Sequence, residues 1–284
     1  MSTVTKKMNE QGIMALKERM KPFTLSESKP NYTYYQLKCE ECTITAYTSG
    51  KVVFQGKDLS WMEDEKKEDT KSSTFPQAGS DEVGTGDYFG PVVVACTIVD
   101  QKAYEKLKKL GIQDSKQITD EMIVKMAPII METVPYSICI LPNSKYNIVH
   151  QSHNMVDIKC QMHNQVYVNM VHKGYSLPDF IIIDQFVQKN SYYRYLKNTK
   201  EVIPNIHFET KAENTYFSVA CASILARNAF LETLQKMEDH YDFTFQKGAG
   251  NKVDICGKEF VKKYGMNELN NVAKLHFKNT EKIR

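Results

Sequence analysis

From residue 77 onward the chain alternates apolar, strand-like runs with helix-like segments, and this alternation restricts the possible folds more than any other feature. Apolar runs rich in β-branched residues predict the strands, at 78–83, 91–99, 136–141, 180–184 and 205–208. Helical periodicity predicts the helices, at 103–109, 119–131, 155–173, 192–200 and 218–234. Strands that alternate with helices predict an α/β domain with a central sheet flanked by helices.

The first 60 residues have a different pattern. Apolar residues recur at helical spacing over 8–20, and Pro22 ends this predicted helix. Strand-like runs rich in Tyr, Thr and Ile follow at 32–39, 42–47 and 51–55. The chain of 284 residues is therefore expected to form a small α+β domain at 1–60 and an α/β domain at 77–284. The charged, then Ser/Thr/Pro-rich segment 61–76 is expected to be a linker.

Charge is distributed unevenly although the net charge is only +3. Residues 1–60 carry nine Lys+Arg against six Asp+Glu, and the last 42 residues carry nine against four. Basic ends favour a nucleic-acid partner. An ordinary pair of solvated helices explains the basic C-terminal segment equally well.

Cysteine usage and hydropathy indicate the compartment. Most of the seven cysteines lie inside apolar segments, which argues against a disulfide scaffold and favours a reducing cytoplasm. No apolar stretch approaches the ~20 residues that a membrane span needs, and no apolar signal core follows the N-terminus. The pairs Cys39/Cys42 and His150/His153 have metal-ligand spacing, but nothing nearby completes a zinc site.

The most informative segment is 79–94, where Asp81 and Glu82 end the first strand of the α/β domain and glycines follow at 84, 86 and 90. Neighbouring side chains of a strand point to opposite faces, so one site can use both carboxylates only if the chain twists there. The glycines permit such a twist and allow backbone amides to approach a sugar-phosphate chain. A polar hairpin turn between two buried strands is the simpler alternative.

Two further acids stand where catalytic groups of α/β proteins are found. Asp184 follows an apolar strand at its carboxyl end, where open α/β sheets bind ligands; Asp179, at the other end, is a weaker candidate. Glu213 precedes a helix rich in small residues that is suited to close packing on a sheet, and Glu209 competes with it. Each acid also has an ordinary interpretation, Asp184 as a cap and Glu213 as an acid favoured by the helix dipole.

Four acids without a His/Cys cluster favour hard, oxygen-preferring cations, Mg²⁺ or Mn²⁺, over zinc. Two such ions held ~3.5–4 Å apart can activate a water molecule and stabilise the leaving oxygen of a phosphodiester. Neither a phosphate-binding P-loop nor a Ser-His-Asp arrangement is recognisable. The acids therefore indicate metal-dependent phosphodiester hydrolysis.

At these residues the sequence resembles a known family, bacterial ribonuclease HIII, the type 3 ribonuclease H. The resemblance is carried by D-E-V-G-T-G-D-Y-F-G-P-V-V-V (81–94), Asp114-Ser-Lys116, I-I-I-D-Q-F (181–186) and T-K-A-E-x-x-x-x-S-V-A-x-A-S-I-L-A-R (210–227). It continues through the segments 247–254 and 272–280 and reaches 43–56 near the N-terminus. It covers nearly the whole chain.

The resemblance implies an RNase H-like catalytic domain with a mixed sheet flanked by helices and a four-carboxylate, two-metal site. Carried over, the catalytic and metal-binding acids are Asp81, Glu82, Asp184 and Glu213, with Asp81 bridging the ions. Substrate-binding residues implied by the family are the Gly84-Thr85-Gly86 loop, whose backbone reads ribose 2′-hydroxyls, and Lys116 and Lys211, for phosphate or the leaving group. Type 2 enzymes carry a Tyr where Ala249 stands here, so a run of ribonucleotides is the expected substrate.

The N-terminal domain resembles the TBP-like domain of the same family, which is implied to grip the hybrid. Its tyrosines 32, 34, 35 and 47 are candidates for a binding face, although half of them are expected in the core because strands alternate faces. The function expected overall is hydrolysis of the RNA strand of RNA/DNA hybrids by a monomer, giving 5′-phosphate and 3′-hydroxyl ends. The alternatives are a type 2 enzyme that acts at single ribonucleotides and a hybrid-binding protein whose acids are structural.

Overall fold

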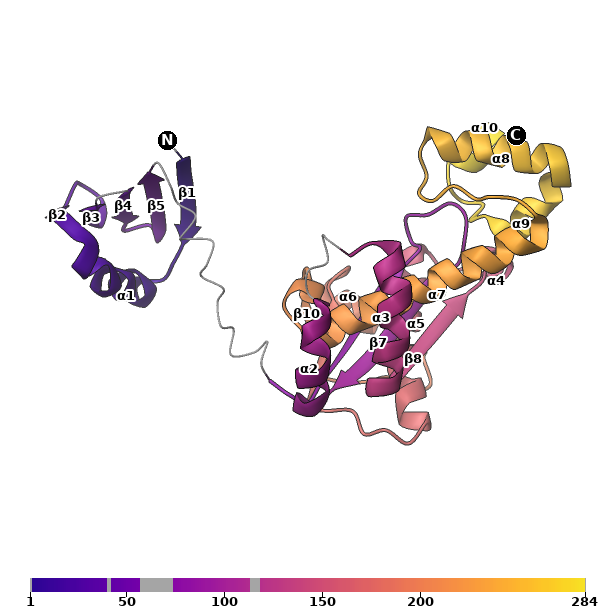
Figure 1. The fold of residues 1–284 in the computed structure, drawn as a ribbon, viewed down its shortest axis with the longest axis horizontal. Helices are drawn as coiled ribbons and strands as arrows, with labels where there is room; N and C mark the ends of the chain where they lie inside the picture. Colours follow the sequence, from indigo (N-terminus) through magenta and orange to yellow (C-terminus); the bar gives the residue numbers. More distant parts are fainter. Residues whose placement is uncertain (1, 40–41, 57–73, 113–117, 284) are drawn as a thin grey trace. The chain divides into compact units, whose positions relative to one another are not determined.

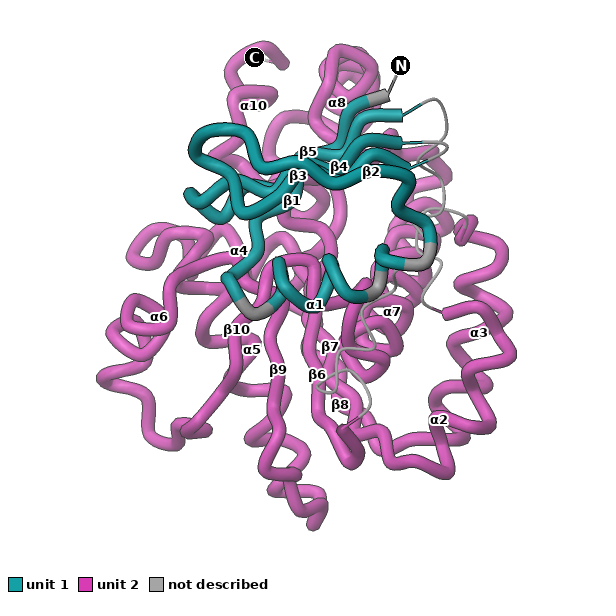
Figure 2. Tube along the Cα trace, turned by 90° about the vertical axis from the view of Figure 1, so that its left-hand side faces the viewer, with its two compact units in different colours: residues 1–69 teal, residues 70–284 magenta. Residues whose placement is uncertain are grey.

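The protein is described by a computed structural model that covers residues 2–39, 42–56, 74–112 and 118–283. The chain divides into two compact units, 1–69 and 70–284, which Figure 2 colours separately. Most of the expected linker 61–76 lies outside the described residues. Each unit has its own hydrophobic core.

The N-terminal unit is a five-stranded antiparallel sheet with one helix (Figure 1). Its elements are β1 (Ser2–Lys7), α1 (Glu10–Met20), β2 (Thr24–Ser28), β3 (Thr33–Cys39), β4 (Cys42–Tyr47) and β5 (Lys51–Gly56), with a short 3-10 turn, η1 (Lys21–Phe23), after α1. The spatial order is β1-β5-β4-β3-β2. The apolar face of α1, with Ile13 and Leu16, packs on one face of the sheet, and the predicted α+β domain is thus confirmed.

Two strands of this unit were not predicted from the sequence. β1 pairs with β5 along its whole length, and β2 pairs with β3 around a bulge. Both are edge strands of polar composition, T-x-T-K-K and T-L-S-E-S, and they gain their strand conformation from backbone hydrogen bonds to a neighbour rather than from apolar alternation.

The second unit contains a mixed sheet in the order β10-β9-β6-β7-β8. The strands are β6 (Gln77–Val83), β7 (Val92–Val99), β8 (Tyr136–Leu141), β9 (Phe180–Asp184) and β10 (His207–Glu209). β10, β9 and β6 run parallel, whereas β7 is antiparallel to both β6 and β8. The predicted mixed sheet flanked by helices is confirmed.

Helices cover both faces of this sheet. One face packs against α2 (Gln101–Leu107), α3 (Asp120–Thr133) and α7 (Phe217–Tyr241), and the other against α4 (Asn143–Val149), α5 (Met155–His172) and α6 (Lys189–Tyr195). β7 serves both layers: Val93 and Ala95 face the α7 side, and Val92 and Val94 face the α5 side. This alternation is why the strand reads as one continuous apolar run.

The central helix α7 crosses the sheet as the long orange helix of Figure 1. An added Cβ at Gly79 on β6 would lie 2.4 Å from the backbone nitrogen of Val219, so the small residues of α7 do permit the close approach that the sequence predicts. By length and composition α7 is the one described helix that could cross a membrane, but 72% of its most apolar window is buried inside the protein. It is therefore the core helix of this unit.

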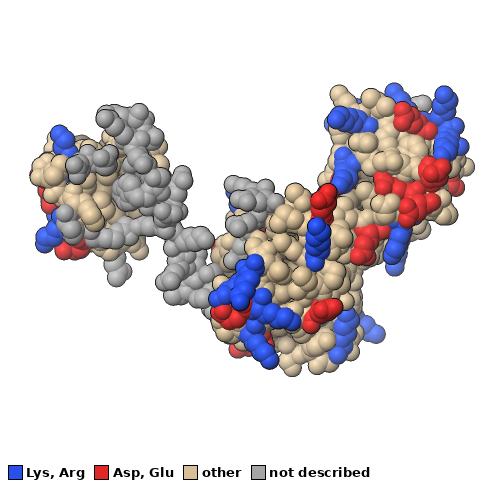
Figure 3. Space-filling model, in the orientation of Figure 1, with Lys and Arg blue, Asp and Glu red and all other residues tan. Residues whose placement is uncertain are grey.

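Several helix boundaries differ from the prediction. α6 lies at Lys189–Tyr195 rather than 192–200, and α7 continues to Tyr241. α4 and the C-terminal helices α8 (Asn251–Tyr264), α9 (Leu269–Val272) and α10 (Asn279–Ile283) were not assigned from the sequence. The last three sit where the basic C-terminal segment was noted. On the face shown in Figure 3, acidic side chains stand among their lysines, and Lys282 pairs with Asp254 at 2.8 Å.

Candidate active site

Two of the predicted acids lie side by side at the end of neighbouring parallel strands. In the register of β6 and β9, Ser80 pairs with Ile183, so the next residue on each strand, Asp81 and Asp184, are neighbours. Both side chains are half-buried. The sheet thus brings together two carboxylates that are about a hundred positions apart in the sequence.

Asp81 faces the α7 side of the sheet. Burial and the neighbouring Glu82 charge raise the pKa of Asp81 to about 7, although hydrogen bonds from the Ser223 hydroxyl and the Glu82 amide oppose the rise. The charge of Asp184 makes a smaller contribution to the same rise. A nearby positive charge would favour the ionised form of this carboxylate.

Glu82 faces the other side of the sheet, as neighbouring residues of a strand do. Its carboxylate accepts a hydrogen bond from His163 of α5 (Oε2 to Nε2, 2.8 Å) and pairs with the ammonium of Lys159. Although burial opposes it, the His163 hydrogen bond and charge, together with Lys159, hold the pKa of Glu82 below its ordinary value. Asp81 and Glu82 therefore occupy different environments although they are adjacent.

Glu213 is brought to Asp184 by a short 3-10 turn, η5 (Ala212–Asn214), that precedes α7. The Ala212 amide donates to Asp184 Oδ1 at 2.9 Å, and Lys211 enters the turn in the left-handed conformation. Burial and the charge of Asp184 raise the pKa of Glu213, partly offset by its own backbone amide and by Lys211. Among the described residues, Glu213 Oε2 is one of two buried side-chain polar atoms without a hydrogen-bond partner.

A pocket of about 280 Å³ lies beside these acids on the α7 side. Its polar lining is Glu213, Ser223, Asp120 and Arg227, and Arg227 is held by Asp120 at 3.0 Å. Within the described part of the chain, no three His, Cys, Asp or Glu side chains converge closely enough to form a metal site.

The donor set nevertheless fits a hard divalent cation. Its members are carboxylate oxygens, which Mg²⁺ and Mn²⁺ prefer. A bound cation would give the buried Oε2 of Glu213 a partner, and its charge would offset the effects that raise the pKa of Asp81. The residues present therefore suit the ions that the sequence implies.

The glycine loop after β6 is fastened by segments distant in sequence. The Gly248 amide donates to Asp87 Oδ1 at 2.6 Å, and the buried Lys274 ammonium donates to the carbonyls of Asp87 (2.8 Å) and Gly90 (2.5 Å). The segments 247–254 and 272–280, which also carry the family resemblance, thus hold the glycine loop in place through these hydrogen bonds.

Within the loop the two predicted glycines differ in their surroundings. Gly84 has φ +91°, and a Cβ there would lie 2.1 Å from the carbonyl oxygen of Pro91. Gly86 is exposed, and an added Cβ would meet no atom within 4 Å. Gly84 is thus required by the fold, whereas Gly86 leaves open space in the loop that follows β6, the strand of Asp81 and Glu82. Thr85, between them, is half-buried.

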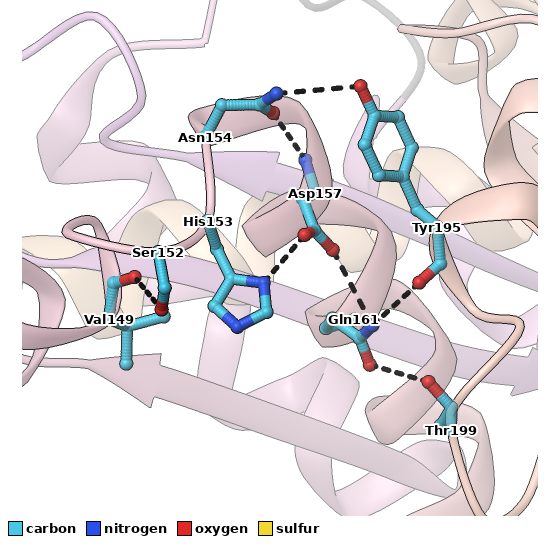
Figure 4. Close-up of polar contacts among 8 residues, drawn as sticks. All are labelled: Val149, Ser152, His153, Asn154, Asp157, Gln161, Tyr195 and Thr199. Carbon is cyan, nitrogen blue, oxygen red and sulfur yellow. Dashed lines mark hydrogen bonds and ion pairs between the residues drawn. The ribbon is translucent and has the colours of Figure 1, made fainter.

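The remaining sequence candidates fall in other places. Lys116 lies outside the described residues, and Asp179 is exposed beyond the far end of β9. Glu209, the competitor of Glu213, accepts the Tyr216 hydroxyl at 2.6 Å. His153 pairs with Asp157 at 2.6 Å on the surface (Figure 4). The free thiols include those of Cys39, Cys96, Cys139, Cys160, Cys221 and Cys256. Neither His150/His153 nor Cys39/Cys42 belongs to a metal cluster among the described residues.

Sequence reasoning missed His163, Lys159 and Ser223. His163 and Lys159 are four positions apart on α5, a spacing that places two polar groups on one face of an otherwise buried helix. That spacing was the available signal, but it does not reveal which residue the pair contacts.

Known proteins resemble this chain over nearly its whole length. The family model of ribonuclease HII matches residues 78–280, and a family described as a domain of unknown function (DUF3378) matches residues 3–74. Ribonuclease HIII of Enterococcus faecalis is 38% identical over 98% of this chain and 97% of its own length. That of Bacillus subtilis is 38% identical over 92% and 90%. This chain belongs to the ribonuclease HIII family.

Solved structures agree with this membership in ribonuclease HIII. Bst-RNase HIII in complex with Mn²⁺ is 36% identical in sequence to this chain and superimposes with a TM-score of 0.74. The match covers 99% of this chain and 98% of the Bst-RNase HIII chain. The ribonuclease H2 from Pyrococcus horikoshii covers 73% of this chain and 96% of its own at 22% identity and a TM-score of 0.60, which shows a shared fold. The chain is therefore an RNase H-type endonuclease with a mixed α/β catalytic fold.

Proposed function

We propose that this ribonuclease HIII hydrolyses the RNA strand of RNA/DNA hybrids with the help of two divalent cations, leaving 5′-phosphate and 3′-hydroxyl ends. The observation that carries the proposal is that Asp81 and Asp184 directly follow the paired residues Ser80 and Ile183 of β6 and β9, with the η5 turn of Glu213 hydrogen-bonded to Asp184. Family membership supports the nuclease chemistry.

Asp81, Glu82, Asp184 and Glu213 would hold the cations, with Asp81 shared between them. Bound Mg²⁺ or Mn²⁺ lowers the pKa of a coordinated water and stabilises the leaving oxygen of a phosphodiester. Support comes from the carboxylate donor set, from the unpartnered Glu213 oxygen and from the Mn²⁺ complex described for Bst-RNase HIII. In the same proposal the exposed Lys211, whose charge reaches Glu213, contacts a phosphate or the leaving group, as does Lys116.

Substrate selection is assigned to the backbone of the loop Gly84-Thr85-Gly86. The open space at Gly86 admits a sugar-phosphate chain close to the backbone amides, where a ribose 2′-hydroxyl can be read. Ala249 offers no aromatic ring in the Lys247–Gly250 segment. A run of ribonucleotides paired with DNA is accordingly the proposed substrate, rather than one isolated ribonucleotide.

The N-terminal unit is proposed to grip the hybrid through the sheet face opposite α1. All but one of the residues that alternate with core positions on this face are polar or basic. They include Thr5, Lys7, Gln36, Lys38, Thr43, Thr45, Tyr47, Lys51 and Gln55, and the exception is Val53. None of these is an acid. Tyr35 is excluded from the face, because it is fully buried and donates its hydroxyl to Ile13. Phosphates favour such a surface.

The domain assignment remains part of the proposal, with a binding domain at 1–60, a linker at 61–76 and a catalytic domain at 77–284. We also infer that the enzyme acts as a monomer in the cytoplasm. The free thiols of Cys39, Cys96, Cys139, Cys160, Cys221 and Cys256, most of them buried, are compatible with a reducing compartment.

Replacing Asp81 with Asn tests the function. Asp81→Asn is expected to abolish hybrid cleavage and to leave hybrid binding nearly intact, because the change removes a charge without changing volume. Asp179→Asn is the matched control, since this acid is exposed just before the opposite end of β9. Wild-type cutting by Asp81→Asn would rule out the assignment. Comparing a long hybrid with a duplex that holds one ribonucleotide tests the proposed substrate.

A further inference from the structure

The carboxylate of Glu82 is held by α5 through both of its oxygens. Oε2 accepts from His163 Nε2 at 2.8 Å, and Oε1 pairs with the ammonium of Lys159. The Glu82 side chain is 13% exposed, that of Lys159 12% and that of His163 0%. Three charged or polar groups in such confinement have a single arrangement rather than a set of interchangeable rotamers.

His163 is fixed from behind by a second hydrogen bond. Its Nδ1 lies 2.8 Å from the hydroxyl of Ser80, which is fully buried on the same face of β6 as Glu82. When the Ser80 hydroxyl donates to Nδ1, Nε2 carries the hydrogen and donates to Glu82. Ser80, His163 and Glu82 therefore form a directed chain that ends on a proposed cation ligand.

The same part of α5 contacts the segment that directly follows β9 and Asp184. The Phe186 ring, two residues after Asp184, stacks on His163 with ring centres 5.1 Å apart and planes at 26°. The Lys159 ammonium lies 3.9 Å from the centre of the same ring, a cation–π distance. One helix thus fastens both strand ends that bear the acids.

The register of α5 is itself fixed on another side (Figure 4). Asn154 caps the helix by accepting from the Asp157 amide at 2.9 Å, and Gln161 donates to the Tyr195 carbonyl at 3.1 Å and accepts from Thr199 at 2.9 Å. These contacts border a pocket of about 630 Å³, which none of the four acids lines. Their consequence is a helix that cannot slide or rotate easily beside β6.

From this geometry we propose that His163 is a positioning residue, which orients Glu82 for binding a divalent cation. The inference rests on the proposed function, because it needs Glu82 to be a cation ligand. Residues that hydrogen-bond a metal ligand typically change metal affinity by about 10–100-fold when they are replaced. His163 does not touch the substrate in this proposal, and it acts only through Glu82.

Two substitutions separate the two bonds of His163. In His163→Gln the amide nitrogen can reach the position of Nε2 and keep the bond to Glu82. In His163→Asn the shorter amide can reach only the position of Nδ1, so the bond to Ser80 is kept and the bond to Glu82 is lost. His172→Asn is the control, because His172 also lies on α5 and also bonds a carboxylate, Glu201 at 2.8 Å, but is exposed.

The experiment measures Mn²⁺ binding to the full chain by calorimetry without substrate, the Mn²⁺ concentration that half-saturates hybrid cleavage, and thermal unfolding in EDTA. His163→Asn is expected to weaken Mn²⁺ binding at least about tenfold and to shift half-saturation by the same factor, with cleavage recovered at high Mn²⁺. His163→Gln should restore most of the affinity, and His172→Asn should match the wild type.

Two results would overturn the inference: wild-type Mn²⁺ affinity in His163→Asn, or equal loss of affinity in the Gln and Asn variants with equal loss of unfolding temperature. If His163→Asn does not fold, Ser80→Ala decides, since it removes only the hydroxyl behind His163. Ser80→Ala should weaken Mn²⁺ binding a few-fold, and unchanged affinity would refute the chain. Failure of the proposed function is seen separately, as a wild-type protein that binds no Mn²⁺ or an Asp81→Asn variant that still cleaves.

Discussion

Replacing Gly86 with alanine tests the substrate-reading role of the glycine loop, and Gly84 provides a matched comparison two residues away. An added Cβ at Gly86 meets no atom within 4 Å, and the residue is outside the left-handed backbone region. Gly84 has φ +91°, and its Cβ would lie 2.1 Å from Pro91 O and 3.1 Å from the Phe230 ring. The same chemical change is therefore harmless to the fold at one position and harmful at the other.

The magnitudes follow from these contacts. Gly84→Ala forces a left-handed residue, at about 1–2 kcal/mol, and overpacks the site, at about 1–3 kcal/mol. The free energy of unfolding should fall by about 2–5 kcal/mol in total. Gly86→Ala should leave it unchanged or raise it by up to about 1 kcal/mol, because the unfolded chain loses freedom. A methyl group at Gly86 that prevents one hydrogen bond between a backbone amide and a 2′-hydroxyl weakens substrate binding by about 1 kcal/mol, which lowers kcat/KM about fivefold.

Urea unfolding of both variants and steady-state cleavage of a long RNA/DNA hybrid measure these effects. Gly86→Ala should show wild-type stability with reduced kcat/KM on the hybrid, and the loss should appear mainly in KM. Wild-type kcat/KM in Gly86→Ala would refute the reasoning that substrate approaches the backbone there. A Gly84→Ala variant as stable as the wild type would refute the account of the turn.

Three further predictions concern other parts of the molecule. Burial lowers the pKa of Lys274 to about 7, so the unfolded chain binds more protons than the folded one between that value and 10.5. The wild-type free energy of unfolding therefore rises with pH relative to that of Lys274→Met, by about 2 kcal/mol from about pH 7.5 to 9.5. A difference between the two proteins that stays constant with pH would contradict this. EDTA should abolish cleavage but not hybrid binding, as an electrophoretic shift assay checks; cleavage in EDTA would exclude the metal mechanism. Removing residues 1–69 should weaken hybrid binding and flatten its salt dependence, with residual cleavage retained; unchanged affinity would contradict the gripping role.

Strands that can be recognised from their own residues were predicted well. β8 and β9 begin and end where the sequence predicts, and β6 and β7 differ by one residue, because buried strands are apolar along their length and are bounded by turn residues. The acid at the end of β9 was recognised for the same local reason. β1 and β2 escaped prediction because polar edge strands depend on hydrogen bonds from partners elsewhere in the chain.

The sequence by itself determined the class of the catalytic fold and the family, and it singled out the four acids proposed as cation ligands, since all of these depend on residue types at short spacing. Only the tertiary structure decided the surroundings of these acids: Asp81 faces α7, whereas Glu82 is held by His163 from α5, some 80 positions away. The physical reason is that a carboxylate's orientation and pKa depend on the groups packed around it. Those groups are brought together by sheet register and helix packing, which no local pattern specifies.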